Sequence, residues 1–242
     1  MYKDVNYVKD RLIVSLISAE RNVNFLKDKP YRMLEDLAIF YKVLISKDAN
    51  GTGTITVTNN HMEYWGLTEE QLYETAIKNS NVLEPPSIDR LTNVMADLMR
   101  AQGMDEDIIE NQLKEDDIDM YVISNTTKAN GASVIVYSDA LQQVAENLGS
   151  DLYILPSSIH EVLALPVGNK DVDSLEEMVR CVNQTEVSPT EVLSDNVYKY
   201  DAESRTLSLA SAKAETVKET AVCEPSGYTG TVNEVARPRH HR

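Results

Sequence analysis

The sequence is poor in cysteine and in aromatic residues other than tyrosine. Its 242 residues include two cysteines, one tryptophan and two phenylalanines, against twelve tyrosines. Two cysteines are too few for a disulfide framework or for a four-cysteine zinc site. Because tyrosine buries its ring while its hydroxyl stays near water, the tyrosines indicate many half-buried positions in β-sheets.

Long apolar runs and positive charge are also scarce. The apolar run near the N-terminus, LIVSLISA over residues 12–19, is too short to cross a bilayer. Asp4 and Asp10 precede it, where a signal peptide would be basic. The net charge of −16 disfavours binding to nucleic acids and to anionic membranes, because like charges repel. We therefore expect a cytoplasmic protein that binds neither nucleic acid nor membrane.

Metal-binding and phosphate-binding motifs are missing. The acidic run over residues 105–119 lacks the glycine of a calcium-binding loop, and it predicts a solvated helix face attractive to a basic partner. The glycine-rich NGTGT over residues 50–54 lacks the lysine of a phosphate-binding loop and predicts a hairpin turn. His61 is interpreted as packing beside Trp65. We therefore expect no cofactor and no metal site.

Periodicity of apolar residues predicts short strands alternating with helices. The firmest prediction is a helix over 69–79, because Thr68 and Gln71 have the spacing of a capping box. The other predicted helices are 87–102, 138–149 and 174–184. The segment 105–119 has a thin apolar stripe at helical spacing. The predicted strands are 10–19, 35–46, 53–58, 120–125, 132–137, 151–155, 162–166, 196–201 and 205–210.

A strand pair followed by a helix recurs over 36–79, 120–148 and 151–185. Short connections between paired strands make them antiparallel. The predicted fold class is therefore α+β, with antiparallel hairpins alternating with helices (β-β-α units) in one domain over 8–209. The apolar period then fades, which predicts a disordered tail over 210–242 that ends in the basic RPRHHR.

One segment, PSSIHE from Pro156 to Glu161, holds the candidate catalytic residues Ser158, His160 and Glu161. In a strand, His160 and Glu161 point to opposite faces, and Ser158 lies roughly 7 Å from His160, so a triad does not form. In a turn, Ser158 and Glu161 have the spacing of a capping box. We interpret the segment as a capped turn between two strands. A small-molecule hydrolase using these residues is the alternative.

Three stretches resemble a domain-of-unknown-function family of anaerobic Gram-positive gut bacteria, over about residues 8–200. They are DLAIFYKVLI, GTGTITVTNNHMEYWGLTEEQLYETAIKNS and the run from MYVISNTTKANG to HEVLALP. A looser similarity extends to another uncharacterised cytoplasmic bacterial family. Neither family has an assigned activity, so the resemblance implies no functional residue. With no convincing catalytic motif, the sequence favours a non-enzymatic protein that binds another protein, as an adaptor or regulator.

Overall fold

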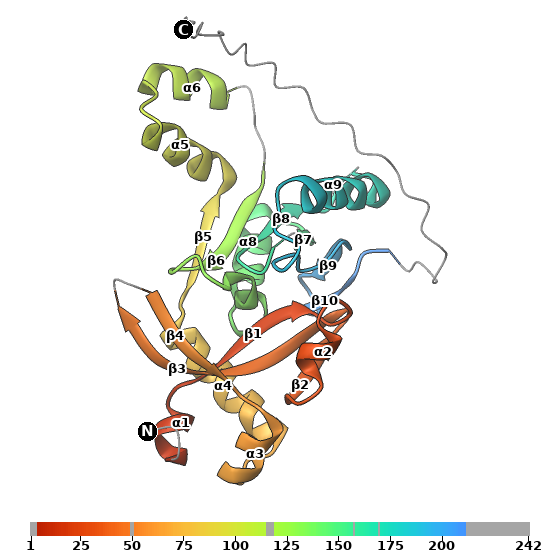
Figure 1. Cartoon of the computed structure of the whole chain (residues 1–242). Coiled ribbons are helices and arrows are strands. Elements are labelled where there is room, and N and C mark those ends of the chain that lie inside the picture. The colour runs from red at the N-terminus through yellow and green to blue at the C-terminus, as the bar shows by residue number, and fades with distance from the viewer. Residues whose placement is uncertain (1–3, 49–50, 115–118, 157, 169, 212–242) are drawn as a thin grey trace, which may run out of the picture. The chain divides into compact units, whose positions relative to one another are not determined.

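The first of two antiparallel sheets, sheet A, is built around one long strand, β3 (Leu37–Asp48). The computed structural model describes residues 4–48, 51–114, 119–156, 158–168 and 170–211 (Figure 1). β1 (Leu12–Ser18) pairs with one side of β3, while β2 (Tyr31–Leu34) and β4 (Gly51–Thr56) pair in succession with the other side. The predicted strands around 10–19 and 35–46 and the hairpin to 53–58 are confirmed. β2 was not predicted.

The second sheet, sheet B, has six strands in the order β10-β9-β7-β8-β6-β5, and every neighbouring pair is antiparallel. Its strands are β5 (Pro86–Arg90), β6 (Tyr121–Asn125), β7 (Leu152–Leu155), β8 (Val162–Pro166), β9 (Tyr198–Asp201) and β10 (Thr206–Leu209). Short connections join β7 to β8 and β9 to β10, as predicted. Both sheets lie within the unit that spans residues 1–212.

Helices pack on these sheets, and the α+β prediction is confirmed. They are α1 (Val5–Lys9), α2 (Val23–Leu26), α3 (Asn59–Trp65), α4 (Glu69–Leu83), α5 (Leu91–Ala101), α6 (Glu106–Lys114), the 3₁₀ turn η1 (Gly131–Ser133), α7 (Val134–Tyr137), α8 (Ala140–Leu148) and α9 (Val172–Thr185). None of those described is long and apolar enough to span a membrane.

Helix α4 begins at the predicted capping box. The Thr68 side chain accepts from the Gln71 backbone N–H, and the Gln71 side chain accepts from the Thr68 N–H. Its buried face, formed by Leu72, Ala76 and Ser80, packs against β1. The Ser80 hydroxyl also accepts a 2.9 Å hydrogen bond from the Val14 N–H on the unpaired edge of β1, so the helix covers that edge.

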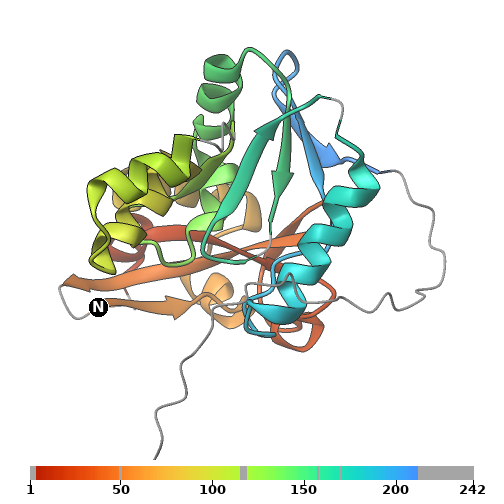
Figure 2. The same cartoon turned by 90° about the horizontal axis from the view of Figure 1, so that it is seen from above.

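The core follows from alternation of side chains along β3. Residues 37, 39, 41 and 43 join the large cluster that also contains Leu72 of α4 and Ile123 of sheet B. Ala38 and Phe40 point to the opposite face of sheet A, where they pack with Leu26 of α2. On sheet B, α9 covers the face turned away from the large cluster (Figure 2), by contacts of Leu175 and Val179.

The two sheets are also joined by a half-buried carboxylate clasp at Asp36. One Asp36 oxygen accepts hydrogen bonds from the Ser194 hydroxyl at 2.7 Å and the Asn196 amide at 3.1 Å. The other accepts from the Tyr198 hydroxyl. Charge-assisted bonds of this kind are stronger than neutral ones. The clasp therefore ties the turn before β3 to the start of β9 and to the irregular segment that precedes it.

Three sequence predictions are corrected. Residues 87–90, predicted as the start of a helix, form β5, whose first residue Pro86 lies on a sheet edge, where a missing N–H is tolerated. Residues 132–137, predicted as a strand, are η1 and α7, because burial of Val134 and Tyr137 on one face overrides their β-propensity. The prediction of a β-β-α unit over 120–148 is therefore wrong, because its second strand does not form. The predicted tail lies outside the described residues, apart from Ala210 and Ser211.

Candidate ligand-binding cleft

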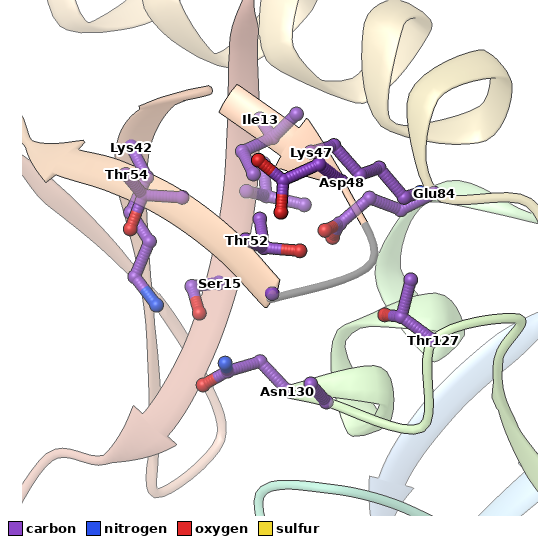
Figure 3. A pocket seen from close by; sticks show the side chains of 13 residues that line it. Ile13, Ser15, Lys42, Lys47, Asp48, Thr52, Thr54, Glu84, Thr127 and Asn130 are labelled. Atoms are coloured by element: carbon purple, nitrogen blue, oxygen red, sulfur yellow. The ribbon is translucent and has the colours of Figure 1, made fainter. Parts of the chain in front are cut away.

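A cleft of about 400 Å³ opens between sheet A and the 125–131 loop that follows β6 (Figure 3). It lies on the face of sheet A that carries Phe40, opposite the large core. Directly opposite residues on paired strands share a face of the sheet. Lys42 of β3 is opposite Ile13 of β1 and Thr56 of β4, and Phe40 is opposite Ser15. The cleft is lined by Ile13, Val14, Ser15, Lys42, Lys47, Asp48, Gly51, Thr52, Thr54, Glu84, Thr127, Ala129 and Asn130.

Lys42 is a charged residue on a face made mostly of apolar side chains. It is half-buried, and its Nζ lies 5.2 Å from the centroid of the Phe40 ring. Within the described residues its ammonium forms no hydrogen bond and no ion pair. Burial lowers the pKa of Lys42 because it disfavours the charged form, and the attraction of Glu84 only partly opposes this.

Glu84 approaches the cleft from the C-terminal end of α4 and is 5% exposed. Its backbone is fixed at both ends, since its N–H donates to Ser80 at 2.8 Å and its C=O accepts from the Tyr137 hydroxyl at 2.7 Å. The carboxylate points into the cleft (Figure 3) and has no hydrogen-bond partner among the described side chains. Burial raises its pKa, against the attraction of Lys47 and Lys42.

Lys42 and Glu84 are close enough for each to affect the other's pKa, yet they form no ion pair. Two desolvated charges without contact are costly, because neither recovers the hydration it has lost. The pKa of Lys42 is lowered and that of Glu84 is raised, and opposed shifts of this kind are common among the groups of functional sites. The pair therefore has the properties of functional groups.

The 125–131 loop is organised by the buried side chain of Asn125. Its Oδ1 accepts from the Thr127 N–H at 3.1 Å and the Ala129 N–H at 3.3 Å, and its Nδ2 donates to the Ala129 carbonyl at 2.9 Å. Asn130 adopts a left-handed backbone conformation, with φ of 51°. The loop thereby directs the Asn130 side chain into the cleft (Figure 3).

The PSSIHE segment supports this loop from behind. The His160 carbonyl accepts a 2.8 Å hydrogen bond from the Ser124 hydroxyl. The His160 Nδ1 accepts from the Asn130 N–H at 3.3 Å, and its Nε2 lies 3.4 Å from a Glu191 carboxylate oxygen. The backbone and the ring of His160 therefore both contact the chain on either side of the loop.

The segment is a turn between β7 and β8, as predicted, but the predicted capping box is not formed. The Ser158 hydroxyl accepts from the His160 N–H at 3.1 Å, and Glu161 is exposed. Ser158 also forms an isolated β-bridge with Val192. The partners of the His160 ring are Asn130 and Glu191, so the structure does not join His160 to Ser158 as base and nucleophile. Ser157 lies outside the described residues.

The sequence analysis also addressed the role of His61 and the presence of metal sites. His61 packs as expected: its ring stacks on Trp65 with a centroid distance of 5.2 Å, and its Nδ1 accepts from the Thr58 N–H that precedes α3. Among the residues that the structure describes, no group of three histidine, cysteine or acidic side chains could hold a metal ion.

The fold and the cleft define an α+β protein with two antiparallel sheets and a polar cavity beside one of them. The chain belongs to the family of unknown function DUF5688, whose model matches residues 1–202 and so includes every residue that lines the cleft. No curated protein and no solved structure was found that matches the chain. The family supplies no activity, and the function must be argued from the geometry.

Sequence reasoning did not identify this cleft. The one available signal was Lys42, a lone charge inside the strand LAIFYKVLI, because a lysine is seldom buried in a strand without a reason. Glu84 and Asn130 carry no such local signal. They reach the cleft only because sheet B places the end of α4 and the 125–131 loop over sheet A.

We expect removal of either buried charge to stabilise the protein. The pKa of Glu84 in the folded state lies above its ordinary value of 4.5, so stability is lost as pH rises from 4.5 through that raised pKa. Glu84→Gln abolishes this loss and should increase the free energy of unfolding at pH 7 by about 1 kcal/mol. Lys42→Met should act in the same direction. Thermal unfolding should record a rise of about 2–4 °C; a fall for both variants would mean that these charges are satisfied within the protein.

The 125–131 loop should tolerate no side chain at Gly131. A Cβ there would lie 2.1 Å from the Ser124 Oγ and 2.6 Å from both the Asn125 nitrogen and the His160 oxygen. Gly131→Ala should therefore reduce the free energy of unfolding by about 2–3 kcal/mol, as overpacking does. The matched control is Gly168→Ala, because that position has open space around it. Equal denaturation midpoints for the two variants would contradict this account.

Proposed function

We propose that the protein binds a small polar molecule in the cleft beside sheet A. The carboxylate of Glu84 carries this proposal: it is almost fully buried, it points into the cavity, and no described side chain satisfies it. Buried charges are normally paired or hydrogen-bonded. A ligand that offers a donor to Glu84 and an acceptor to Lys42 supplies both missing partners.

The size and lining of the cleft support this proposal. A volume of about 400 Å³ lies within the roughly 300–1,000 Å³ of small-molecule sites. Nine of the thirteen lining residues are polar or charged, among them Ser15 and Asn130, and apolar residues such as Ile13 complete the wall. A lining of this kind favours a polar ligand that is oriented by hydrogen bonds.

A thermal-shift screen tests the proposal. The probes are free amino acids, sugars, sugar phosphates, nucleotides and small carboxylic acids at millimolar concentration. A ligand at about 100 times its Kd stabilises the folded state by about 2.7 kcal/mol, so at least one probe class should raise the melting temperature by several degrees. The double variant Lys42→Met/Glu84→Gln should lose the shift.

The control is Lys199→Met/Glu161→Gln, which removes the same charges outside the cleft and should keep the shift. Lys199 pairs with Asp151 on the surface of sheet B, and Glu161 is exposed. No shift with any class, or a shift that survives in the cleft variant, would overturn the proposal.

A second candidate function is the protein binding expected from the sequence, and the α5–α6 hairpin favours it. Leu98, Met104 and Ile108 are 58%, 39% and 49% exposed. Exposed acids, including Asp97 and Asp107, are next to these apolar residues in the sequence. An apolar patch with a charged rim is typical of a protein interface. The partner that fits has an apolar surface rimmed by lysine or arginine. The adaptor role, the cytoplasmic location and the hydrolase alternative stay predictions.

Affinity capture with paired variants tests the second candidate. The tagged wild-type chain should retain a partner from its native host at near-stoichiometric amounts, and added salt should weaken retention because the rim is acidic. Leu98→Arg/Ile108→Arg should abolish it. Val82→Arg changes an apolar residue on α4 that is even more exposed, and it should leave retention intact. Retention by both variants would exclude the hairpin as the interface.

A further inference from the structure

A second pocket of about 320 Å³ adjoins the cleft. Lys42, Thr54 and Asn130 line both cavities, so they mark the junction between them. Glu84 belongs to the first cavity only, whereas Phe25 and Phe40 belong to the second only. The combined space therefore has a carboxylate at one side, a cluster of hydrogen-bond donors in the middle and an aromatic wall at the other side.

The junction has the groups that bind a carboxylate. The Lys42 ammonium, the Thr54 hydroxyl and the Asn130 amide can each donate a hydrogen bond, and ammonium–carboxylate bonds are charge-assisted. No described side chain accepts from the Lys42 ammonium or the Asn130 amide. A bound anionic group at the junction would therefore meet donors that are otherwise unused.

The Glu84 side of the first cavity is suited to a positive group. When ionised, its carboxylate accepts hydrogen bonds and donates none, and an ammonium beside it favours that form. The positive groups that face it are Lys42 and Lys47, and Lys47 is already engaged with the Leu83 carbonyl at 2.8 Å. The charges of Lys42 and Glu84 influence one another without touching. A ligand that carries both an ammonium and a carboxylate can bridge that gap.

The second cavity supplies an apolar surface next to this polar junction. Phe25 and Phe40 meet edge to face with ring centroids 5.3 Å apart, and Phe25 keeps 38% of its surface exposed. Ile17 completes the apolar side of the lining. An aliphatic or aromatic group placed here would cover exposed ring surface and gain hydrophobic free energy.

We infer that the ligand of the cleft is an apolar α-amino acid. Its ammonium lies at Glu84, its carboxylate binds at the Lys42–Thr54–Asn130 junction, and its side chain lies against Phe25 and Phe40. These three groups stem from one carbon atom. Because the junction residues line both cavities, a ligand bound there can reach Glu84 on one side and the phenylalanines on the other. The inference rests on the proposed function, since it names the ligand class of the same cleft.

Calorimetric titration with matched ligands tests this inference. L-Phenylalanine and L-leucine should bind the wild-type protein. 3-Phenylpropionate lacks the ammonium, phenethylamine lacks the carboxylate and glycine lacks the side chain. Each should bind at least about tenfold more weakly, which corresponds to the loss of one charge-assisted bond or of one buried apolar group.

Variants assign each ligand group to its partner. In Glu84→Gln the preference for L-phenylalanine over 3-phenylpropionate should disappear, and in Lys42→Met the preference over phenethylamine should disappear. Phe25→Ala should reduce the preference over glycine while keeping the dependence on both charges. Because Phe25 is partly exposed and the other two changes remove buried charges, all three variants should stay folded, which circular dichroism checks.

The outcomes separate this inference from the proposed function. If sugars, phosphates or other classes bind in a manner that depends on Lys42 and Glu84, the cleft is a ligand site but the amino-acid assignment is wrong. If 3-phenylpropionate binds as tightly as L-phenylalanine, the role of Glu84 is wrong. If no class of probe binds, both proposals fail together.

Discussion

The alternation of side chains along β3 is the constraint on which the rest of the structure depends. Every second residue from Leu37 to Val43 enters the large core, and burial of this set determines the register of sheet A, because a slip of one residue would expose it. The residues between them must therefore face the other way. That geometry places Lys42 beside Phe40 and opposite Ile13, where an ammonium is poorly solvated. The charge is held there by the core on the opposite side of its own strand.

The other half of the cleft depends on contacts between sheets. The Asp36 clasp ties sheet A to β9 and to the segment that precedes it, and Tyr137 holds the carbonyl of Glu84 at the end of α4. Gly131 lets β6, the 125–131 loop and the PSSIHE turn approach within distances that exclude a Cβ. The histidine that looked like a catalytic base instead accepts the Asn130 N–H. Its polar atoms position a loop, and the loop presents Asn130 to the cavity.

Local rules predicted the elements whose determinants are local. Thr68 and Gln71 begin α4 because a capping box needs only three residues of spacing, and alternation identified β1 and β3. The strand predicted for residues 132–137 was wrong because valine and isoleucine favour strands by themselves. The helix forms there because it buries Val134 and Tyr137 in the large core. Local rules did not predict the cleft for a related reason. Lys42, Glu84 and Asn130 are separated by more than forty residues of chain in each interval, and only the packing of the two sheets brings them together.

A structural explanation of Lys42 and Glu84 meets a physical difficulty. Methionine and glutamine of similar volume would occupy the same positions without the cost of desolvating a charge, and the large core of sheet A lies on the other face. The fold therefore gains nothing from these charges as they stand. Ion pairing would make them a structural bridge, yet they stop short of contact. Natural proteins keep such destabilising groups where activity requires them. The separation of Lys42 and Glu84 therefore says what kind of ligand fits between them. Two opposite charges held apart across a cavity define the length and the polarity of that ligand. The aromatic wall beyond Lys42 selects an apolar group on it.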